Sequence, residues 1–408
     1  MERYQPAQID ELSRRFVPRM VPSPGALEGD AVELTGGPDL SPEAIAERCA
    51  WSRDFLLRFI RTEMGDDPSL IELAERTLSD GREGLELIGG RRDATQADPV
   101  HVEVGLEVIV RTDGSRPAFV VRDDFIVPDS SPPGVWTELL TDVTREDAIR
   151  MVLGSVGRVD ITHPMFPFAG TGWLIAPDLI ATNRHVAQLF VEFPAAGGAR
   201  LKTELEPRID FGHEFTGRDS VNRREITDIV FSGDRPVPLV GIDHSVLDLS
   251  IFRIAPAGPD GRQQPLALGI APHLATPQTQ VIVAGYPGRP AADALGSVSE
   301  TDRVLRLLFG KRWGFKRLAT GEIMPSTIGP RTLNHDASTL GGNSGSLVMG
   351  LDSIPAVTGI HYGGTWGGDR ANWAHVIAQV MDEPGLPGLK HETLAALCKA
   401  EGVTLSEG

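Results

Sequence analysis

Residues 335–350 read HDASTLGGNSGSLVMG, and in the centre of this stretch Ser344 has small residues on both sides. The segments around it are rich in bulky aliphatic side chains. The small residues offer less apolar surface for packing than those side chains would. Glycine permits backbone conformations and close approaches that other residues avoid. The stretch therefore predicts a tight turn that presents Ser344 beside bare backbone amides.

The composition is that of a large soluble globular protein. The chain has 408 residues, of which 41% are hydrophobic and 23% charged, so it has room for two or three domains with a sizeable core. The net charge of -17 disfavours nucleic acid and anionic membranes as partners. Residues 1–16 contain no apolar core of a signal peptide, and no run of about 18 apolar residues follows, so we expect a cytoplasmic protein. Cys49 and Cys398 lie far apart, outside the motifs below, and imply neither a disulfide framework nor zinc.

The first part of the chain is expected to be helical. Apolar residues recur at helical spacing within residues 1–95, and Ser41 precedes one such run as a helix cap. This region is either an adaptor or regulatory module or a structural buttress. Residues 96–154 are expected to form a connecting segment with a β-hairpin, whose strands are VEVGLEVIV at 102–110 and RPAFVVRDDFIV at 116–127, and then a helix near 144–154.

From residue 155 to 385 short β-like runs alternate with turns, as 45 glycines and 31 prolines also suggest. No regular helix alternates with these runs, which favours an antiparallel barrel or sandwich over a parallel sheet. ANWAHVIAQVMDE at 371–383 is predicted to be a closing helix. A last helix is expected in the tail, residues 386–408.

A serine hydroxyl becomes a good nucleophile only beside a base, and a carboxylate must orient that base. His185 lies near the end of the stretch GTGWLIAPDLIATNRHV, just after an apolar hairpin, and Asp248 is the first residue of the apolar run DLSIFRI. Either residue alone is more often structural. Their order with Ser344, however, is that of chymotrypsin-type double barrels, and it differs from the Ser, Asp, His order of α/β-hydrolases. The joint pattern predicts a catalytic triad.

These blocks, together with VAGYPG, LGGNSGSLV and GIHYGG, resemble those of trypsin-like serine peptidases over residues 155–385. The likeness is greatest to the bacterial glutamyl endopeptidase (V8-like) branch. It implies a mainly β fold, a double six-stranded antiparallel β-barrel, here preceded by a mostly helical region. By the resemblance, His185 is general base and then general acid, Asp248 orients it, and Ser344 forms an acyl-enzyme. The N–H groups of Gly342 and Ser344 would form the oxyanion hole, and no metal or organic cofactor is needed.

The resemblance also implies where substrate side chains bind. A preference for Arg or Lys needs a carboxylate six residues before the serine, and that position is Ser338. Thr339 next to it, and His361 and Gly363 in the strand GIHYGG, are predicted to bind the substrate and to favour cleavage of proteins or peptides after Glu, less often Asp. The alternative that His361 only packs against the barrel stays open.

Control of the activity is expected to differ from that of secreted relatives. Many zymogens of the family pair a new N-terminal ammonium with an aspartate just before the serine, but Asn343 stands there. Restraint would then come from the N-terminal region, from the insertion at 289–332 or from a regulatory protein partner, in a signalling or defence context. Two alternatives are a catalytically silent binding scaffold and an HtrA-like quality-control protease. An HtrA-like protease requires a C-terminal peptide-binding domain, whereas only residues 386–408 follow the barrel.

Overall fold

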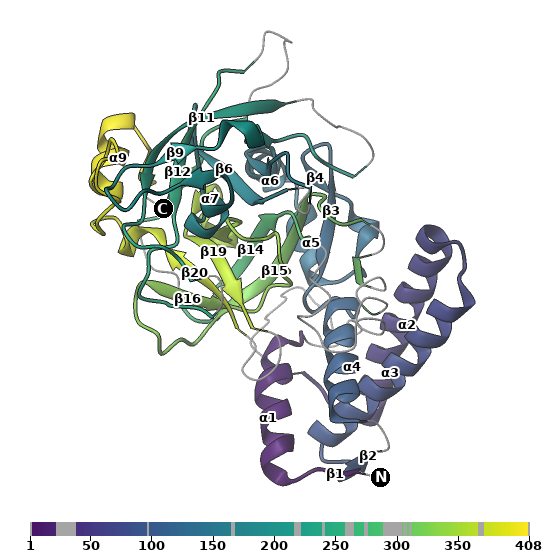
Figure 1. The fold of residues 1–408 in the computed structure, drawn as a ribbon. Helices are drawn as coiled ribbons and strands as arrows, with labels where there is room; N and C mark the ends of the chain where they lie inside the picture. Colours follow the sequence, from purple (N-terminus) through teal and green to yellow (C-terminus); the bar gives the residue numbers. More distant parts are fainter. Residues whose placement is uncertain are drawn as a thin grey trace. The chain divides into compact units, whose positions relative to one another are not determined.

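A computed structural model describes residues 2–21, 38–95, 98–164, 168–215, 222–238, 241–257, 265–272, 276–288, 304, 308–309, 312–365 and 371–406. The chain divides into two compact units (Figure 1). The helical unit comprises Met1–Phe119, Val127–Asp142 and Pro290–Trp313, and the barrel unit comprises Val120–Ile126, Val143–Arg289 and Gly314–Gly408. Within the predicted insertion at 289–332, residues 289–303, 305–307 and 310–311 lie outside the described residues.

The helical unit follows the start signals of its sequence. Three long helices begin with a proline in their first turn, directly after a side chain that accepts a backbone N–H bond: Ser41, Asp67 and Asp98. The expectation of a helical N-terminal region is confirmed. The elements of this unit are β1 (Glu2–Arg3), α1 (Pro6–Phe16), η1 (Val17–Arg19), α2 (Pro42–Met64), α3 (Pro68–Ile88), β2 (Ala94–Thr95), α4 (Pro99–Thr112), η3 (Pro128–Ser130) and α5 (Val135–Thr141).

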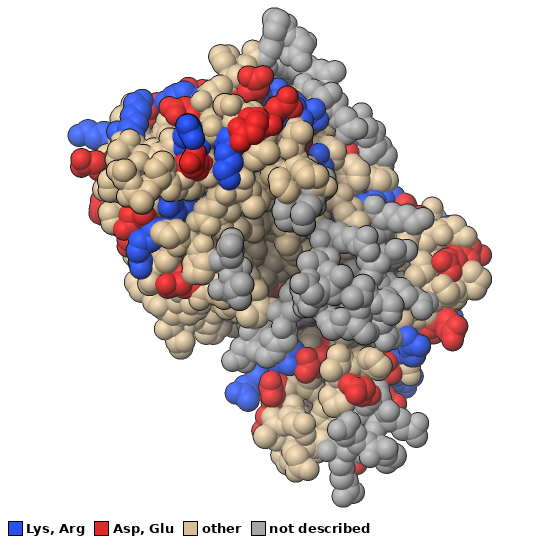
Figure 2. Space-filling model, in the orientation of Figure 1, with Lys and Arg blue, Asp and Glu red and all other residues tan. Residues whose placement is uncertain are grey.

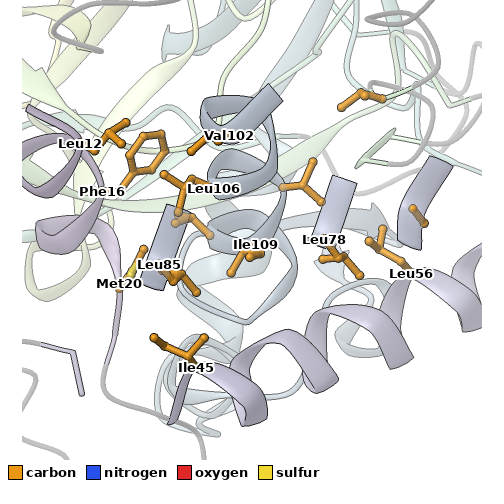
Figure 3. Close-up of a cluster of buried hydrophobic side chains, with 14 of the residues drawn as sticks. Leu12, Phe16, Met20, Ile45, Leu56, Leu78, Leu85, Val102, Leu106 and Ile109 are labelled. Atoms are coloured by element: carbon orange, nitrogen blue, oxygen red, sulfur yellow. The ribbon is translucent and has the colours of Figure 1, made fainter. Parts of the chain in front are cut away.

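The core of the helical unit lies between α1, α2, α3 and α4. Figure 3 shows Phe16, Leu85 and Leu106 among the side chains of this buried cluster, which also includes Val304. Helices α3 and α4 approach closely at two glycines, because a Cβ on Gly105 would lie 2.2 Å from the backbone nitrogen of Gly81. Each glycine is therefore required by the contact between the two backbones.

One sequence prediction is wrong in this region. The run at 102–110, expected to be a strand, lies in helix α4. Asp98 caps the helix and Pro99 starts it, while burial on nearly every side makes its sequence apolar without a helical period. Packing overrides the modest preference of valine and isoleucine for strands. The hairpin predicted between 102–110 and 116–127 is therefore not formed, and the structure instead has a hairpin within the second run, between β3 (Ala118–Arg122) and β4 (Phe125–Ile126).

The barrel unit contains two closed six-stranded antiparallel barrels, which confirms the predicted fold class. The strand order is β10-β11-β12-β7-β6-β5 in the first barrel and β14-β17-β19-β20-β16-β15 in the second, where β14 pairs with β15 to close the ring. The strands of the first barrel are β5 (Val156–Asp160), β6 (Gly170–Ala176), β7 (Leu179–Thr182), β10 (Arg208–Asp210), β11 (Arg223–Ser232) and β12 (Ser250–Ile254). Those of the second are β14 (Gln280–Gly285), β15 (Arg317–Met324), β16 (Thr332–His335), β17 (Leu347–Gly350), β19 (Gly359–Gly364) and β20 (Asn372–Val376).

Smaller elements complete the unit. They are α6 (Glu146–Gly154), α7 (Arg184–Phe190), β8 (Val191–Glu192), β9 (Arg200–Leu201), η4 (Thr203–Leu205), β13 (Gly269–Ile270), η6 (Leu351–Ser353), β18 (Ala356–Val357), η7 (Ile377–Gln379) and α9 (Leu394–Glu401). The helices predicted near 144–154 and in the C-terminal tail are confirmed as α6 and α9.

The prediction of a helix over 371–383 is wrong. This segment forms strand β20 and the short turn η7. Strand β20 pairs with β16 on one side and with β19 on the other, so the second barrel depends on it. Its apolar residues fit a helical spacing by chance, and pairing with two neighbouring strands decides the outcome.

The surface in Figure 2 carries basic and acidic side chains interspersed among uncharged ones. No helix of the described chain combines the length and the apolar character needed to cross a membrane.

Candidate active site

His185 and Asp248 meet at the end of the first barrel. The chain leaves β7 at Thr182 and enters α7, so His185 lies in the first turn of that helix. His185 Nδ1 lies 2.6 Å from Asp248 Oδ2, and the backbone N–H of His185 donates to Asp248 Oδ1 over 2.8 Å. A carboxylate oxygen accepts hydrogen bonds, so the proton on Nδ1 faces Asp248 and Nε2 is the ring nitrogen left to act as a base.

The backbone of Asp248 is held from two sides. Asn183 Nδ2 donates to the Asp248 carbonyl over 2.8 Å, and the Asp248 N–H donates to His375 Nε2 over 3.0 Å. Burial lowers the pKa of His375 to about 4, so this imidazole is neutral and accepts the bond. Neither partner stands out in the sequence, because Asn183 lies in a turn and His375 in the segment predicted as a helix.

Ser344 lies in the tight turn that the sequence predicts. Gly342 and Gly345 on either side have φ of 90° and 89°, a region that favours glycine. A Cβ on Gly342 would lie 2.5 Å from the Tyr286 carbonyl oxygen, and one on Gly345 would lie 2.1 Å from the Thr171 carbonyl oxygen. The small residues are therefore required by both backbone conformation and close approach.

The Gly342 amide is presented by a hydrogen bond to the preceding carbonyl. Gly288 N–H donates to the Gly341 carbonyl over 2.5 Å, which fixes the plane of the peptide between residues 341 and 342. In a trans peptide the C=O and N–H groups point in opposite directions. The Gly342 N–H consequently points away from Gly288.

The Ser344 amide is presented in the same way. Ser346 N–H donates to the Asn343 carbonyl over 2.8 Å, so the N–H of Ser344 points away from that bond. Within the part of the chain that the structure describes, neither the Gly342 nor the Ser344 N–H donates to a protein acceptor. Two such amides can bind an oxyanion, as the predicted oxyanion hole requires.

Gly170 of strand β6 lies close to both Val186 and Ser344. A Cβ on Gly170 would lie 2.8 Å from a methyl of Val186, the neighbour of His185, and 2.9 Å from the Ser344 carbonyl oxygen. The same carbonyl accepts the Thr171 N–H over 2.9 Å. Among the described residues no hydrogen bond joins the Ser344 hydroxyl to His185. In free enzymes this bond is often long and shortens in the reacting complex.

His361 and His335 form a buried pair in the second barrel. His361 is 3% exposed, and its Nδ1 lies 3.2 Å from His335 Nε2. Burial, and then the neighbouring His335, hold the pKa of His361 well below its usual value, and burial lowers that of His335 to about 3, so both are neutral. His335 Nδ1 is buried with no hydrogen-bond partner in the described regions. An orphaned acceptor costs less than an orphaned N–H, which favours a His335 that donates from Nε2 and a His361 that carries its proton on Nε2.

Of the other residues of the predicted pocket, Ser338 and Thr339 follow strand β16 and Gly363 lies on strand β19 with His361. Thr339 Oγ1 donates to Asn372 Oδ1 over 2.6 Å, while Asn372 Nδ2 donates to the Ala337 carbonyl over 2.8 Å. The Thr339 proton is thus engaged. Ser338 is buried, and Gly363 is half-buried on strand β19.

Comparisons with known proteins point to one family. The family model of the trypsin-like peptidase domain matches residues 170–353. A probable serine protease of Lysobacter enzymogenes is 31% identical over 276 residues, which cover 64% of this chain and 70% of the relative. Among solved structures, an inactive mutant form of Rv3671c from M. tuberculosis H37Rv is 19% identical and covers 66% of this chain and 96% of its own, with a TM-score of 0.36. A mutant of human heparin binding protein (CAP37) is 12% identical and covers 57% and 90%, with a TM-score of 0.38.

Proposed function

We propose a function from one premise: this chain belongs to the family of trypsin-like serine peptidases. We infer that it hydrolyses peptide bonds in protein or peptide substrates, with Ser344 as nucleophile, His185 as base and Asp248 as the acid that orients the base. The observation that carries the proposal is the double contact of His185 with Asp248, through Nδ1 and through the backbone N–H. This contact fixes both the tautomer and the direction of the imidazole.

In the first half of the proposed reaction, Ser344 Oγ attacks the substrate carbonyl carbon and passes its proton to His185 Nε2. The N–H groups of Gly342 and Ser344 bind the oxyanion, and the loss of one such donor typically raises the barrier by about 3 kcal/mol. The His185 imidazolium then protonates the leaving amine, and an acyl-enzyme remains. In the second half, His185 removes a proton from water, which attacks the ester and releases the acid.

The test is peptide hydrolysis by three variants. Ser344→Ala and His185→Ala should each lower kcat by a factor on the order of 10^6, as in a comparable triad. Ser346→Ala, at the next serine in the turn, should keep most of the activity. If Ser344→Ala retained wild-type turnover, the assignment of the nucleophile would be wrong and a binding scaffold would be the better description of this chain.

We further propose that the primary pocket prefers Glu, and less often Asp, as in the V8-like branch. His361 supports this, because its Nε2–H can donate to a carboxylate when His335 donates to its Nδ1. A bound carboxylate would raise the pKa of His361 and strengthen the contact. Thr339 already donates to Asn372, so a substrate carboxylate would have to displace that bond. We therefore assign His361 the larger part.

The pocket proposal is tested by kcat/KM for matched peptides with Glu, Gln, Arg or Phe at the cleavage position. His361→Ala and His335→Leu should each lower the Glu-to-Gln ratio about 10-fold or more, since hydrogen bonds to charged groups contribute about 1.5–3 kcal/mol. His101→Ala in the helical unit is the control, because this histidine is exposed on α4. A preference for Arg or Phe, or an unchanged ratio in His361→Ala, would contradict the pocket assignment and leave the triad standing.

We also propose that the enzyme is cytoplasmic and restrained by the helical unit or by a protein partner that binds it, in a signalling or defence context. Two free cysteines support a reducing compartment. Asn343 supports control without N-terminal processing, because it cannot form the usual charge pair with a new ammonium group.

Arg312 within the insertion offers a test of this restraint in the full chain. Arg312 pairs with Glu63 of α2, and Phe309 is 1% exposed in the same unit. The part of the insertion up to Trp313 therefore belongs to the helical unit, whereas Gly314 and the residues after it belong to the barrel unit. If this attachment restrains the enzyme, Arg312→Ala should raise kcat/KM at least several-fold. Arg53→Ala, which breaks the exposed pair with Glu75, is the control. Equal activity of wild type and Arg312→Ala would speak against restraint through this attachment.

A further inference from the structure

One aromatic ring in the barrel unit is surrounded by glycines from three separate segments. Phe168 is half-buried just before β6. A Cβ on Gly288 would lie 3.1 Å from its Cζ, one on Gly314 would lie 3.0 Å from its Cε1, and one on Gly342 would lie 3.0 Å from its Cε2. The three glycines therefore approach three different carbons of the ring, and any side chain there would crowd it.

The ring is held in place by Arg158. The guanidinium carbon of Arg158 lies 5.3 Å from the centroid of Phe168, in the range of a cation–π contact. Arg158 Nη1 donates to the Gly314 carbonyl over 3.1 Å, and Nε donates to Asp160 Oδ1 over 2.6 Å. Asp160 is 5% exposed, so this pair is shielded from water and fixes the guanidinium.

The glycines around Phe168 also carry the hydrogen bonds that shape the oxyanion hole. Gly288 N–H fixes the peptide plane that presents the Gly342 N–H, and the ring touches both residues. Gly314 N–H donates to the Pro287 carbonyl over 2.8 Å, which joins the residues on either side of the part of the insertion that belongs to the helical unit. Without the ring, water could reach these backbone groups and compete for the bond from Gly288.

We propose that Phe168 is a positioning residue for the oxyanion hole, and that Gly288 and Gly314, which flank residues 289–313 of the insertion, act on the hole through its ring. The proposal rests on the proposed function, since the hole serves acyl transfer. It adds a physical link between these two flanking glycines and Gly342, all of it within the barrel unit. A change at Gly288 or Gly314 then alters the position of the Gly342 N–H.

The test compares Phe168→Ala and Phe168→Leu with Phe125→Ala. Phe125 is a matched control, because it is also half-buried in the barrel unit and lies under a guanidinium, with Arg150 4.6 Å from its centroid. The first readout is hydrogen exchange of the amides of residues 341–346, which does not depend on catalysis. We expect Phe168→Ala to exchange about 10-fold faster there than wild type, Phe168→Leu to be intermediate and Phe125→Ala to be unchanged.

The second readout is kcat and KM for each active site, counted by titration with an acylating inhibitor. We expect kcat to fall about 10- to 100-fold in Phe168→Ala with KM changed less than about twofold, because the hole acts on the transition state. A merely structural role would lower the number of titrated sites and leave kcat for each site unchanged.

The outcomes separate the two proposals. Exchange as slow as in wild type, or an unchanged kcat for each titrated site, would overturn the role of Phe168. A wild type that neither hydrolyses peptides nor titrates would overturn the proposed function, and the exchange data would still decide whether Phe168 holds the turn.

Discussion

Replacement of Asp248 by asparagine changes one atom and reverses one hydrogen bond. The backbone N–H of His185 requires an acceptor at Oδ1, 2.8 Å away, so the amide oxygen of the asparagine takes that place. The amide nitrogen then faces His185 Nδ1, at the position now 2.6 Å from it. Since an amide nitrogen only donates, Nδ1 must accept and the proton moves to Nε2. A histidine in that tautomer cannot take the proton of Ser344.

The expected loss in kcat is about 10^4-fold, the cost of the wrong tautomer in the best-studied triad, which corresponds to about 5 kcal/mol of barrier. The assay is peptide hydrolysis at pH 7, with thermal unfolding measured on the same samples. Asp243→Asn is the matched control, because this exposed aspartate lies in the same loop and only accepts from Ser245. A folded Asp248→Asn with activity within 10-fold of wild type would refute the tautomer argument.

Three further changes test other parts of the account. Gly345→Ala should destabilise the protein by about 3 kcal/mol or more in urea unfolding, whereas Gly198→Ala, which has φ of 77° but open space around it, should cost only about 1–2 kcal/mol. His375→Leu should lower kcat because it orphans the Asp248 N–H, and His375→Gln, which keeps an acceptor, should restore most of it; equal effects of the two would contradict this. Bonds from Lys390 and Arg253 lower the pKa of Glu401 from 4.5 to about 2. The contribution of the ionised Glu401 to the free energy of unfolding should therefore be complete above pH 4.5 and disappear as the pH falls towards 2. Glu401→Gln should remove that pH dependence and lower the free energy of unfolding at neutral pH by about 1 kcal/mol. An acid unfolding curve equal to that of wild type would contradict the assignment.

Ser344 was predictable from the sequence because the steric requirements of the backbone around it restrict the neighbouring residue types. Ser344 was surrounded by glycines because a Cβ at Gly345 would lie 2.1 Å from another backbone, and that need is visible in the composition of the turn. His185 and Asp248 each follow or open a strand, and their order with Ser344 matched a known arrangement. Their contact in the structure follows from two strand ends that meet in one barrel.

The residues to which we assign positioning roles are not distinguished by their local sequence. His335, His375 and Phe168 lie in or beside strands, and nothing local distinguishes them from core residues. Their roles depend on which segments the barrels bring together, as with His335 and His361, which are 26 positions apart in the sequence.

The two wrong predictions of secondary structure have the same origin. Helix α4 reads as a strand because burial on nearly every side removes its period, and strand β20 reads as a helix because its apolar spacing fits either form. In both cases the neighbouring elements decide the structure. For α4 they are the helices that surround it, and for β20 they are β16 and β19.

The most direct test of the central claim, that Ser344 is an activated nucleophile, is labelling with a fluorophosphonate followed by mass spectrometry of the labelled peptide. The account predicts one adduct on Ser344, its loss in Ser344→Ala, strong slowing in His185→Ala and retention in Ser346→Ala. An adduct on another residue, or equal labelling of wild type and Ser344→Ala, would contradict the claim.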